Sequence, residues 1–195
     1  MVNDLSPITL EEDVLRYHHL AAGVIQRSSK GILTLARRAD WVAVPVESTC
    51  HLSKEDERRL VRALEQTGMP VVYAVALEPV FPHPSVYAVA VSLPGIQAFN
   101  RETSHLNFVL LDEAVTCAII CTTDDFFVVA GFAEVVQIIL ESEIDEAFAA
   151  FERFATDAHW PERSRRMLLS ILKALRVDYP MLPAGDSVTF PQEGT

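Results

Sequence analysis

Apolar residues follow two different spacings along this chain, and the contrast predicts a fold built from both strands and helices. Short continuous apolar runs are typical of strands buried within a sheet. The chain contains such runs at residues 41–46, 71–77, 86–91, 107–111, 115–121 and 126–130. They predict a sheet of about six strands.

Other segments place an apolar residue at every third or fourth position, as one face of a helix does. Helices are therefore predicted over residues 10–28, 53–68, 95–101, 132–151 and 161–177. Thr9 and Glu12 have the spacing of a capping box at the start of the first helix. Ser142 and Asp145 predict a break that divides the 132–151 segment into two helices.

The segment 41–77 combines a strand, a helix and a second strand, which is the order of a βαβ unit. A right-handed crossover between parallel strands is the usual topology of such a unit. Pro45 lies inside the first strand. Because proline has no N–H to donate, it predicts either a strand end or a strand at the edge of the sheet.

Together the elements predict an α/β fold with an α+β-like order. A single domain over residues 1–177 is expected to contain a mixed sheet, flanking helices and a C-terminal helical segment. Residues 178–195 contain three prolines and two glycines, and they are predicted to form an irregular tail.

Composition narrows the class of protein further. Half of the 195 residues are apolar, which suits one packed core. The start of the chain has no basic stretch leading into an apolar run, and no long uncharged segment follows, so we expect a soluble, cytoplasmic protein with no membrane partner. Cys117 and Cys121 lie too far apart along one strand to form a disulfide, or to join Cys50 and His51 around one zinc ion.

The net charge of −11 comes mainly from one region of the chain. Residues 112–157 contain eleven acidic residues and a single basic one, Arg153. A strongly acidic chain is a poor candidate for binding nucleic acid, because phosphate contacts depend on Lys and Arg. An acidic surface favours association with a basic protein, and it also favours solubility alone. The carboxylates expected to face a basic partner are Glu141, Glu143, Asp145, Glu146 and Glu152.

This charge asymmetry leads to the main hypothesis. In it, the protein is a non-catalytic binding or regulatory protein that acts as an adaptor or inhibitor. The hypothesis depends on the acidic region staying outward and unneutralised, because the arginines of the last helix are able to cancel part of it. The chain has no glycine-rich phosphate loop, no nucleophile elbow and no zinc motif, and no cofactor is predicted.

A small hydrolase or transferase is the first alternative, and it uses the segment 100–107. In that interpretation His105 is a general base and Arg101 holds an anionic group, with Glu102 beside them. The competing interpretation is a set of solvated side chains between a helix and a strand. No partner nucleophile can be assigned to these residues from the sequence.

Two further hypotheses concern loops. Asp124 and Asp125 are candidate ligands for Mg²⁺, although adjacent aspartates between two apolar strands are more typical of a hairpin turn. A small-molecule sensor is the second alternative function. In it the loop 79–84 covers a pocket beside the strands of Tyr73 and Tyr87.

Overall fold

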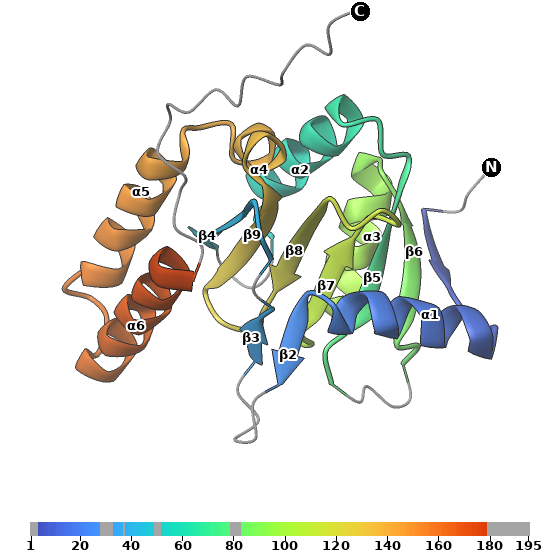
Figure 1. Cartoon of the computed structure of the whole chain (residues 1–195), viewed down its shortest axis with the longest axis horizontal. Coiled ribbons are helices and arrows are strands. Elements are labelled where there is room, and N and C mark those ends of the chain that lie inside the picture. The colour runs from blue at the N-terminus through green and yellow to red at the C-terminus, as the bar shows by residue number, and fades with distance from the viewer. Residues whose placement is uncertain (1–3, 28–32, 37, 49–51, 79–82, 179–195) are drawn as a thin grey trace, which may run out of the picture.

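The centre of the fold is a sheet of seven strands, counted over the residues that the structure describes (Figure 1). The structure is a computed structural model that describes residues 4–27, 33–36, 38–48, 52–78 and 83–178. The sheet lies between helices, which confirms the predicted α/β fold class.

The strands of the sheet lie in the order β1-β6-β5-β7-β8-β9-β4, and each pair of neighbours is antiparallel. Their bounds are β1 Leu5–Pro7, β4 Trp41–Glu47, β5 Val71–Ala76, β6 Val86–Ala90, β7 Phe108–Leu111, β8 Cys117–Cys121 and β9 Phe126–Phe132. A separate hairpin pairs β2 with β3, and its bounds are Ile25–Arg27 and Leu33–Leu35.

Six helices are present in the described part of the chain. Their bounds are α1 Glu11–Ala22, α2 Lys54–Gln66, α3 Leu93–Thr103, α4 Ala133–Leu140, α5 Ile144–Thr156 and α6 Glu162–Asp178. The predicted break within residues 132–151 is confirmed, because α4 ends at Leu140 and α5 begins at Ile144.

Helices cover both faces of the sheet. Residues in register on adjacent strands point to the same face, so Tyr73 and Phe108 lie on opposite faces. Tyr17 of α1 stacks on Tyr73 with a centroid distance of 4.0 Å, and Phe99 of α3 contacts Phe108 at 5.9 Å. Figure 1 accordingly shows α1 in front of the sheet and α3 behind it.

Near β4 the two layers are formed by other helices. Phe126 shares the face of Tyr73, and Phe151 of α5 packs edge-to-face on it at 5.9 Å. Helix α5 in turn packs against α6. On the other face α2 packs against both α3 and α4. The strand β4 therefore lies between α5 on one face and the α2–α4 pair on the other.

In the predicted βαβ unit, β4 and β5 are not neighbours in the sheet, because three other strands lie between them. β4 and β5 run in the same direction, because four successive antiparallel pairings lie between them. Helix α2 connects them, as expected from the sequence. However, β9, β8 and β7 occupy the space between the two strands. These strands come later in the chain, so a local pattern could not reveal the insertion.

The position of β4 at one end of the sheet explains Pro45. The Ser48 N–H donates to the Asp125 carbonyl at 3.0 Å, and in an antiparallel ladder every second residue bonds to the same neighbour. Val46 therefore directs its backbone groups towards β9, whereas Pro45 and Glu47 direct theirs to the free side. Proline at this position removes no hydrogen bond from the ladder. The predicted edge position is confirmed.

The first helix is shorter than predicted, and it begins without a capping box. The helix expected over residues 10–28 ends at Ala22, and β2 follows it. The N-cap is Leu10, whose side chain forms no cap hydrogen bond, so the predicted box of Thr9 and Glu12 is wrong. In this part of the chain the apolar residues have helical spacing, but residues 25–27 pair with β3 as a strand instead. Tertiary pairing can override local helical preference in this way.

The two ends of the domain also differ from the prediction. β1 was not expected, because three residues are too short for a recognisable pattern and its partner β6 lies far along the chain. At the other end α6 includes Asp178, the first residue of the predicted tail. Residues 179–195 lie outside the described residues.

Gly95 supplies a test of how closely α3 approaches the sheet. A Cβ atom at this position would lie 2.3 Å from the Ala90 carbonyl oxygen and 2.9 Å from that of Asp4. We expect Gly95→Ala to lower the free energy of unfolding by about 1–3 kcal/mol, since backbone segments must move apart. Denaturant unfolding measures the change. Gly23→Ala is the control, with its nearest atom 3.2 Å away, and equal losses in both variants would contradict the close approach.

Candidate functional site

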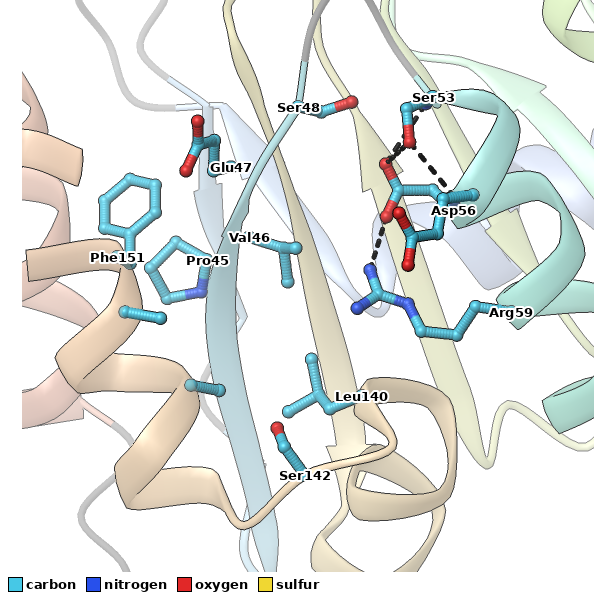
Figure 2. A pocket seen from close by; sticks show the side chains of 13 residues that line it. Pro45, Val46, Glu47, Ser48, Ser53, Asp56, Arg59, Leu140, Ser142 and Phe151 are labelled. Atoms are coloured by element: carbon cyan, nitrogen blue, oxygen red, sulfur yellow. Dashed lines mark hydrogen bonds and ion pairs between the residues drawn. The ribbon is translucent and has the colours of Figure 1, made fainter. Parts of the chain in front are cut away.

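A cleft of about 490 Å³ lies along the free side of β4, and we call it the edge cleft (Figure 2). Its lining includes residues 45–48, four residues at the start of α2, and five residues between Leu140 and Phe151. A volume of this size is within the range of sites that bind small molecules.

The edge cleft extends around the edge of β4 from one face of the sheet to the other. Successive residues of a strand point to opposite faces. Pro45 and Glu47 consequently lie on the α5 side with Phe151, and Val46 lies on the α2 side, as Figure 2 shows. The floor of the cleft is therefore the free edge of a strand, with a helix on either side of it.

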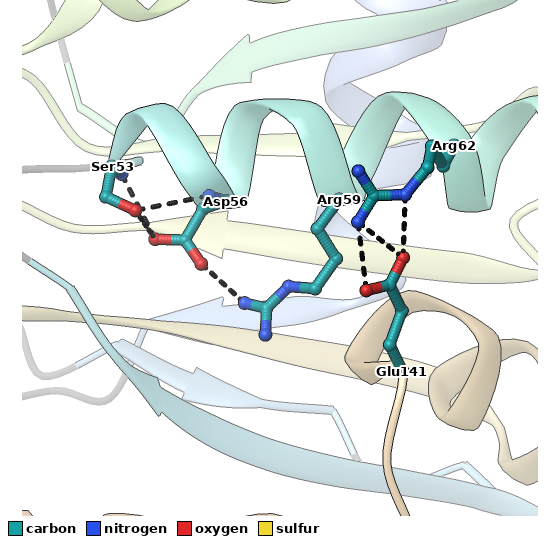
Figure 3. A network of polar contacts seen from close by, with 5 residues as sticks. All are labelled: Ser53, Asp56, Arg59, Arg62 and Glu141. Carbon is teal, nitrogen blue, oxygen red and sulfur yellow. Dashed lines mark hydrogen bonds and ion pairs between the residues drawn. The ribbon is translucent and has the colours of Figure 1, made fainter.

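The start of α2 is held in place by a complete capping box (Figure 3). The Asp56 N–H donates to the Ser53 hydroxyl oxygen at 3.1 Å, and the Ser53 N–H donates to the Asp56 carboxylate at 3.1 Å. The other carboxylate oxygen of Asp56 accepts from the Arg59 guanidinium. Asp56 and Arg59 thus neutralise one another inside the cleft, where both are largely buried.

Asn100 of α3 bonds to Leu52, the residue before the N-cap of α2. Its side-chain oxygen accepts from the Leu52 N–H at 3.3 Å, and its amide donates to the Leu52 carbonyl at 2.8 Å. The same amide group donates to the buried carboxylate of Glu57 at 2.8 Å. These bonds position the start of α2, and with it Ser53 in the wall of the cleft.

An ion pair connects α2 to the turn between α4 and α5. Arg62 donates to both carboxylate oxygens of Glu141, with distances between 2.7 and 2.9 Å (Figure 3). Glu141 has a φ of 51°, a left-handed conformation that ends α4 and turns the chain towards Ser142 in the cleft. This pair joins α2 to the α4–α5 turn, the two elements that contribute Ser53 and Ser142 to the edge cleft.

The charge that remains in the cleft is negative. Glu47 and Glu55 line it, both are exposed, and neither forms an ion pair with the residues that the structure describes. Lys54 and Arg58 of α2 lie outside the lining. Since Asp56 and Arg59 cancel, Glu47 and Glu55 set the sign of the field within the cleft.

The arginines of α6 neutralise only a small part of the acidic region. Arg176 approaches the Glu152 carboxylate at 3.4 Å, so this predicted partner-facing residue is paired within the chain. Arg165 and Arg166 instead pair with Glu162 of their own helix.

The other predicted partner-facing carboxylates lie around the turn between α4 and α5. Glu141 is engaged by α2, as described above. Glu143 accepts a hydrogen bond from the Gln137 amide at 2.7 Å. Asp145 and Glu146 are exposed in the first turn of α5 and form no ion pair with a described residue. Glu143, Asp145 and Glu146 lie in the sequence between Ser142 and Ala147, which both line the edge cleft.

The candidate catalytic residues lie at and beyond the end of α3. His105, Arg101 and Glu102 are exposed, and none of them lines the edge cleft. Arg101 and Glu102 approach each other at 3.7 Å. The hydrolase or transferase hypothesis stays a prediction. Within the same segment, Asn100 has the structural contacts given above.

Asp124 and Asp125 form the connection between β8 and β9, which pair as an antiparallel hairpin. Both side chains are exposed. The Asp124 N–H donates to the Thr122 hydroxyl at 3.3 Å, an interaction of a tight turn. Over the described residues, no group of three or more potential ligands could hold a metal ion.

Cys117 and Cys121 are buried at the two ends of β8 and carry free thiols. Burial raises the pKa of each thiol from 9.0 to about 12, with Asp112 adding to the shift at Cys117 and Asp56 adding to it at Cys121. Cys50 and His51 lie outside the described residues.

The sensor hypothesis places a pocket beside the strands of Tyr73 and Tyr87. Tyr87 is in register with Ala74, whose neighbour Tyr73 points to the opposite face of the sheet. The hypothesis stays a prediction. Residues 79–82 of the loop proposed to cover that pocket are outside the described part of the chain.

Comparison with known proteins assigns no role to the edge cleft. No protein-family model, curated protein or solved structure matches this chain. Where the structure describes the chain, no helix combines the length and apolar character needed to cross a bilayer.

Sequence reasoning missed most of the edge cleft. Ser53 was recognised as the start of a helix, and Pro45 as a sign of a sheet edge. Nothing in the sequence connects Pro45 and Ser53 to Phe151, because the packing of α5 on β4 and of α2 on α4 brings these residues together. Pro45 inside an apolar run was the one signal that pointed to the site.

The thiols provide a test that depends on pH. With an ordinary pKa of 9.0 the unfolded thiols are about half ionised at pH 9, whereas those of the folded protein, with a pKa of about 12, remain protonated. We expect iodoacetamide to leave Cys117 and Cys121 unmodified in the folded protein and to modify both after unfolding, as read by mass spectrometry of peptides. Rapid modification of either thiol without unfolding would contradict its burial. Stability should fall as pH rises above 9, because only the unfolded state then loses these protons.

Ser53 tests the capping box at the wall of the cleft. Ser53→Ala removes the oxygen that accepts from the Asp56 N–H, and we expect it to lower the free energy of unfolding by about 1 kcal/mol. Ser53→Thr, which retains a hydroxyl, is the matched control and should lose much less. Urea unfolding compares the three proteins, and equal stability of the alanine variant would show that the box contributes little.

Proposed function

We propose that this protein is a non-catalytic binding protein that engages a basic polypeptide through the edge cleft. The observation that carries the proposal is the pair of exposed carboxylates, Glu47 and Glu55, which line the cleft without a cationic partner among the described residues. We propose the edge cleft as the binding surface in place of the acidic region 112–157 as a whole, which partly borders the cleft.

The walls of the cleft favour a ligand with both a cationic and an apolar part. Val46 supplies partly exposed apolar surface next to the two carboxylates, whereas Leu140 and Phe151 border the cleft but are themselves buried. Lysine and arginine combine an aliphatic stem with a charged head, so one side chain can contact both kinds of surface.

The rest of the lining supports binding more than catalysis. Asp56 already accepts from Ser53 and Arg59, so it has neither the exposure nor the free geometry of a general base. Glu47 and Glu55 come from different elements, and no histidine or cysteine is present among the lining residues that the structure describes. A reaction needs a nucleophile and a base within hydrogen-bond reach of each other.

Carboxylates beyond the cleft extend the negative field around it. Asp145 and Glu146 lie on α5 one turn or less from Ala147 of the lining, and they are exposed. Charges outside a contact surface mainly increase the association rate, and salt reduces their effect. A basic polypeptide is therefore expected to bind faster at low ionic strength, with the residues of the cleft determining which segment of it stays bound.

The test uses a fluorescent hexa-arginine peptide with a hexa-glutamate peptide as the opposite-charge control, at about 0.05 M and about 0.5 M salt. We expect the arginine peptide to bind and the added salt to weaken its binding. The double variant Glu47→Gln with Glu55→Gln should raise Kd about tenfold, since exposed ion pairs contribute up to about 1 kcal/mol each. Fluorescence anisotropy measures each Kd.

Glu65→Gln is the matched control, because Glu65 is an exposed carboxylate on the same helix as Glu55 but outside the cleft. It should change Kd little. Equal binding of the two peptides would contradict the proposal. So would a loss of affinity in Glu65→Gln as large as that in the double variant, because the attraction would then depend on overall charge and not on the cleft.

A further inference from the structure

We infer that the basic polypeptide binds in an extended conformation and pairs with the free edge of β4 as an additional strand. This inference rests on the proposed function and specifies the binding mode at the same cleft. It follows from three features of β4: the register of its backbone groups, the space beside it, and the charge of the side chain at its end.

The register determines which backbone groups reach the cleft. Ser48 bonds to Asp125 of β9, so Val46 also faces β9, and the intervening Glu47 directs its N–H and its carbonyl outward. Pro45 directs a carbonyl outward and has no N–H. One donor and two acceptors are thus presented along the part of β4 that lines the cleft. These are the groups that an added strand requires.

The space beside β4 is open where these groups lie. An added strand lies about 4.8 Å from its neighbour, with its side chains pointing alternately to the two faces of the sheet. The edge cleft has this form, because α5 borders it on one face and α2 on the other (Figure 2). Further back along β4, residues 41–44 are buried and lie outside the lining of the cleft, so pairing is confined to the stretch from Pro45, which is buried but lines the cleft, to Glu47.

The same geometry predicts where the basic side chain of the partner lies. Directly opposed residues of paired strands point to one face, with Cβ atoms about 5 Å apart. A lysine or arginine opposite Glu47 would therefore lie beside its carboxylate on the α5 side, near Phe151. The next residue of the partner would point to the α2 side, where Val46 and Glu55 favour an apolar or a second basic side chain.

Pro45 restricts this pairing to a short segment. An exposed sheet edge is able to pair with almost any extended chain, and proline is one of the residues that limit such pairing. Because Pro45 has no N–H, Glu47 supplies the one outward N–H among residues 45–47. Backbone bonds alone would then be few, and side-chain contacts must supply much of the affinity. This requirement favours partners with the matching basic residue.

A second copy of this chain is a less suitable occupant of the same edge. Pairing two β4 edges would bring Glu47 and Glu55 of both copies together, and opposed like charges destabilise a strand pair. Concentration-dependent dimerisation, measured by sedimentation and lost in Glu47→Pro, would therefore overturn the inference in favour of self-association. We expect a monomer in the absence of peptide.

The test uses a seven-residue peptide of alternating valine and arginine, capped at both ends, with the folded full chain. Two analogues carry N-methyl groups on alternate amides, one on the odd and one on the even positions. Only one edge of a paired strand faces β4, so we expect one analogue to lose affinity at least about tenfold and the other to bind nearly as the parent does. Anisotropy gives the three Kd values.

Variants of β4 provide an independent readout. Glu47→Pro removes the outward donor together with the charge, and Glu47→Gln removes the charge alone, so the proline variant should bind several-fold more weakly than the glutamine variant. Pro45→Ala restores a donor on the free side and should strengthen binding by about twofold or more. Thermal unfolding verifies that each variant is folded.

The outcomes separate this inference from the proposed function. If both N-methylated analogues bind as the parent does, with unchanged dependence on Glu47 and salt, strand addition is wrong and the basic ligand binds through its side chains. If the parent peptide does not bind, or a valine–glutamate analogue binds as well, the proposed function itself is wrong. A gain of affinity in Pro45→Ala together with one sensitive analogue supports strand addition.

Discussion

The candidate site depends on the fact that, within the described part of the chain, β4 pairs with a strand on one side only. Its inward backbone groups are bonded to β9, and this register directs the groups of Glu47 and Pro45 away from the sheet. Helices cover both faces of β4, yet they do not close over its end. A cleft with a strand edge as its floor is the consequence.

Acidic residues have two different roles around this cleft. Glu141 and Glu152 are bound by arginines, and the bidentate pair of Glu141 with Arg62 joins α2 to the α4–α5 turn. Glu47 and Glu55 have no such partner among the described residues and give the cleft its negative field. A count of charges along the chain cannot make this distinction, because it depends on which carboxylate lies within reach of a guanidinium.

The segment 100–107 shows how a cluster of polar residues can serve the structure. Asn100 holds both backbone groups of Leu52 and contacts the buried Glu57, so it joins α3 to the start of α2. This arrangement keeps the capping box of Ser53 in place beside β4. Polar groups that are buried and fully bonded fix the relative positions of helices, since an unbonded group would carry a desolvation penalty.

Local pattern alone was sufficient for much of the fold. Apolar runs and helical spacing predicted the principal strands and helices, the break between α4 and α5, and the α2 crossover, and Pro45 predicted an edge strand. Short-range physics determines these features, because periodicity, caps and proline act over a few residues. Strand order, the insertion of β9, β8 and β7 between β4 and β5, and the edge cleft were decided by the tertiary structure. They depend on pairings between residues far apart in the chain, for which a single sequence contains no local signal.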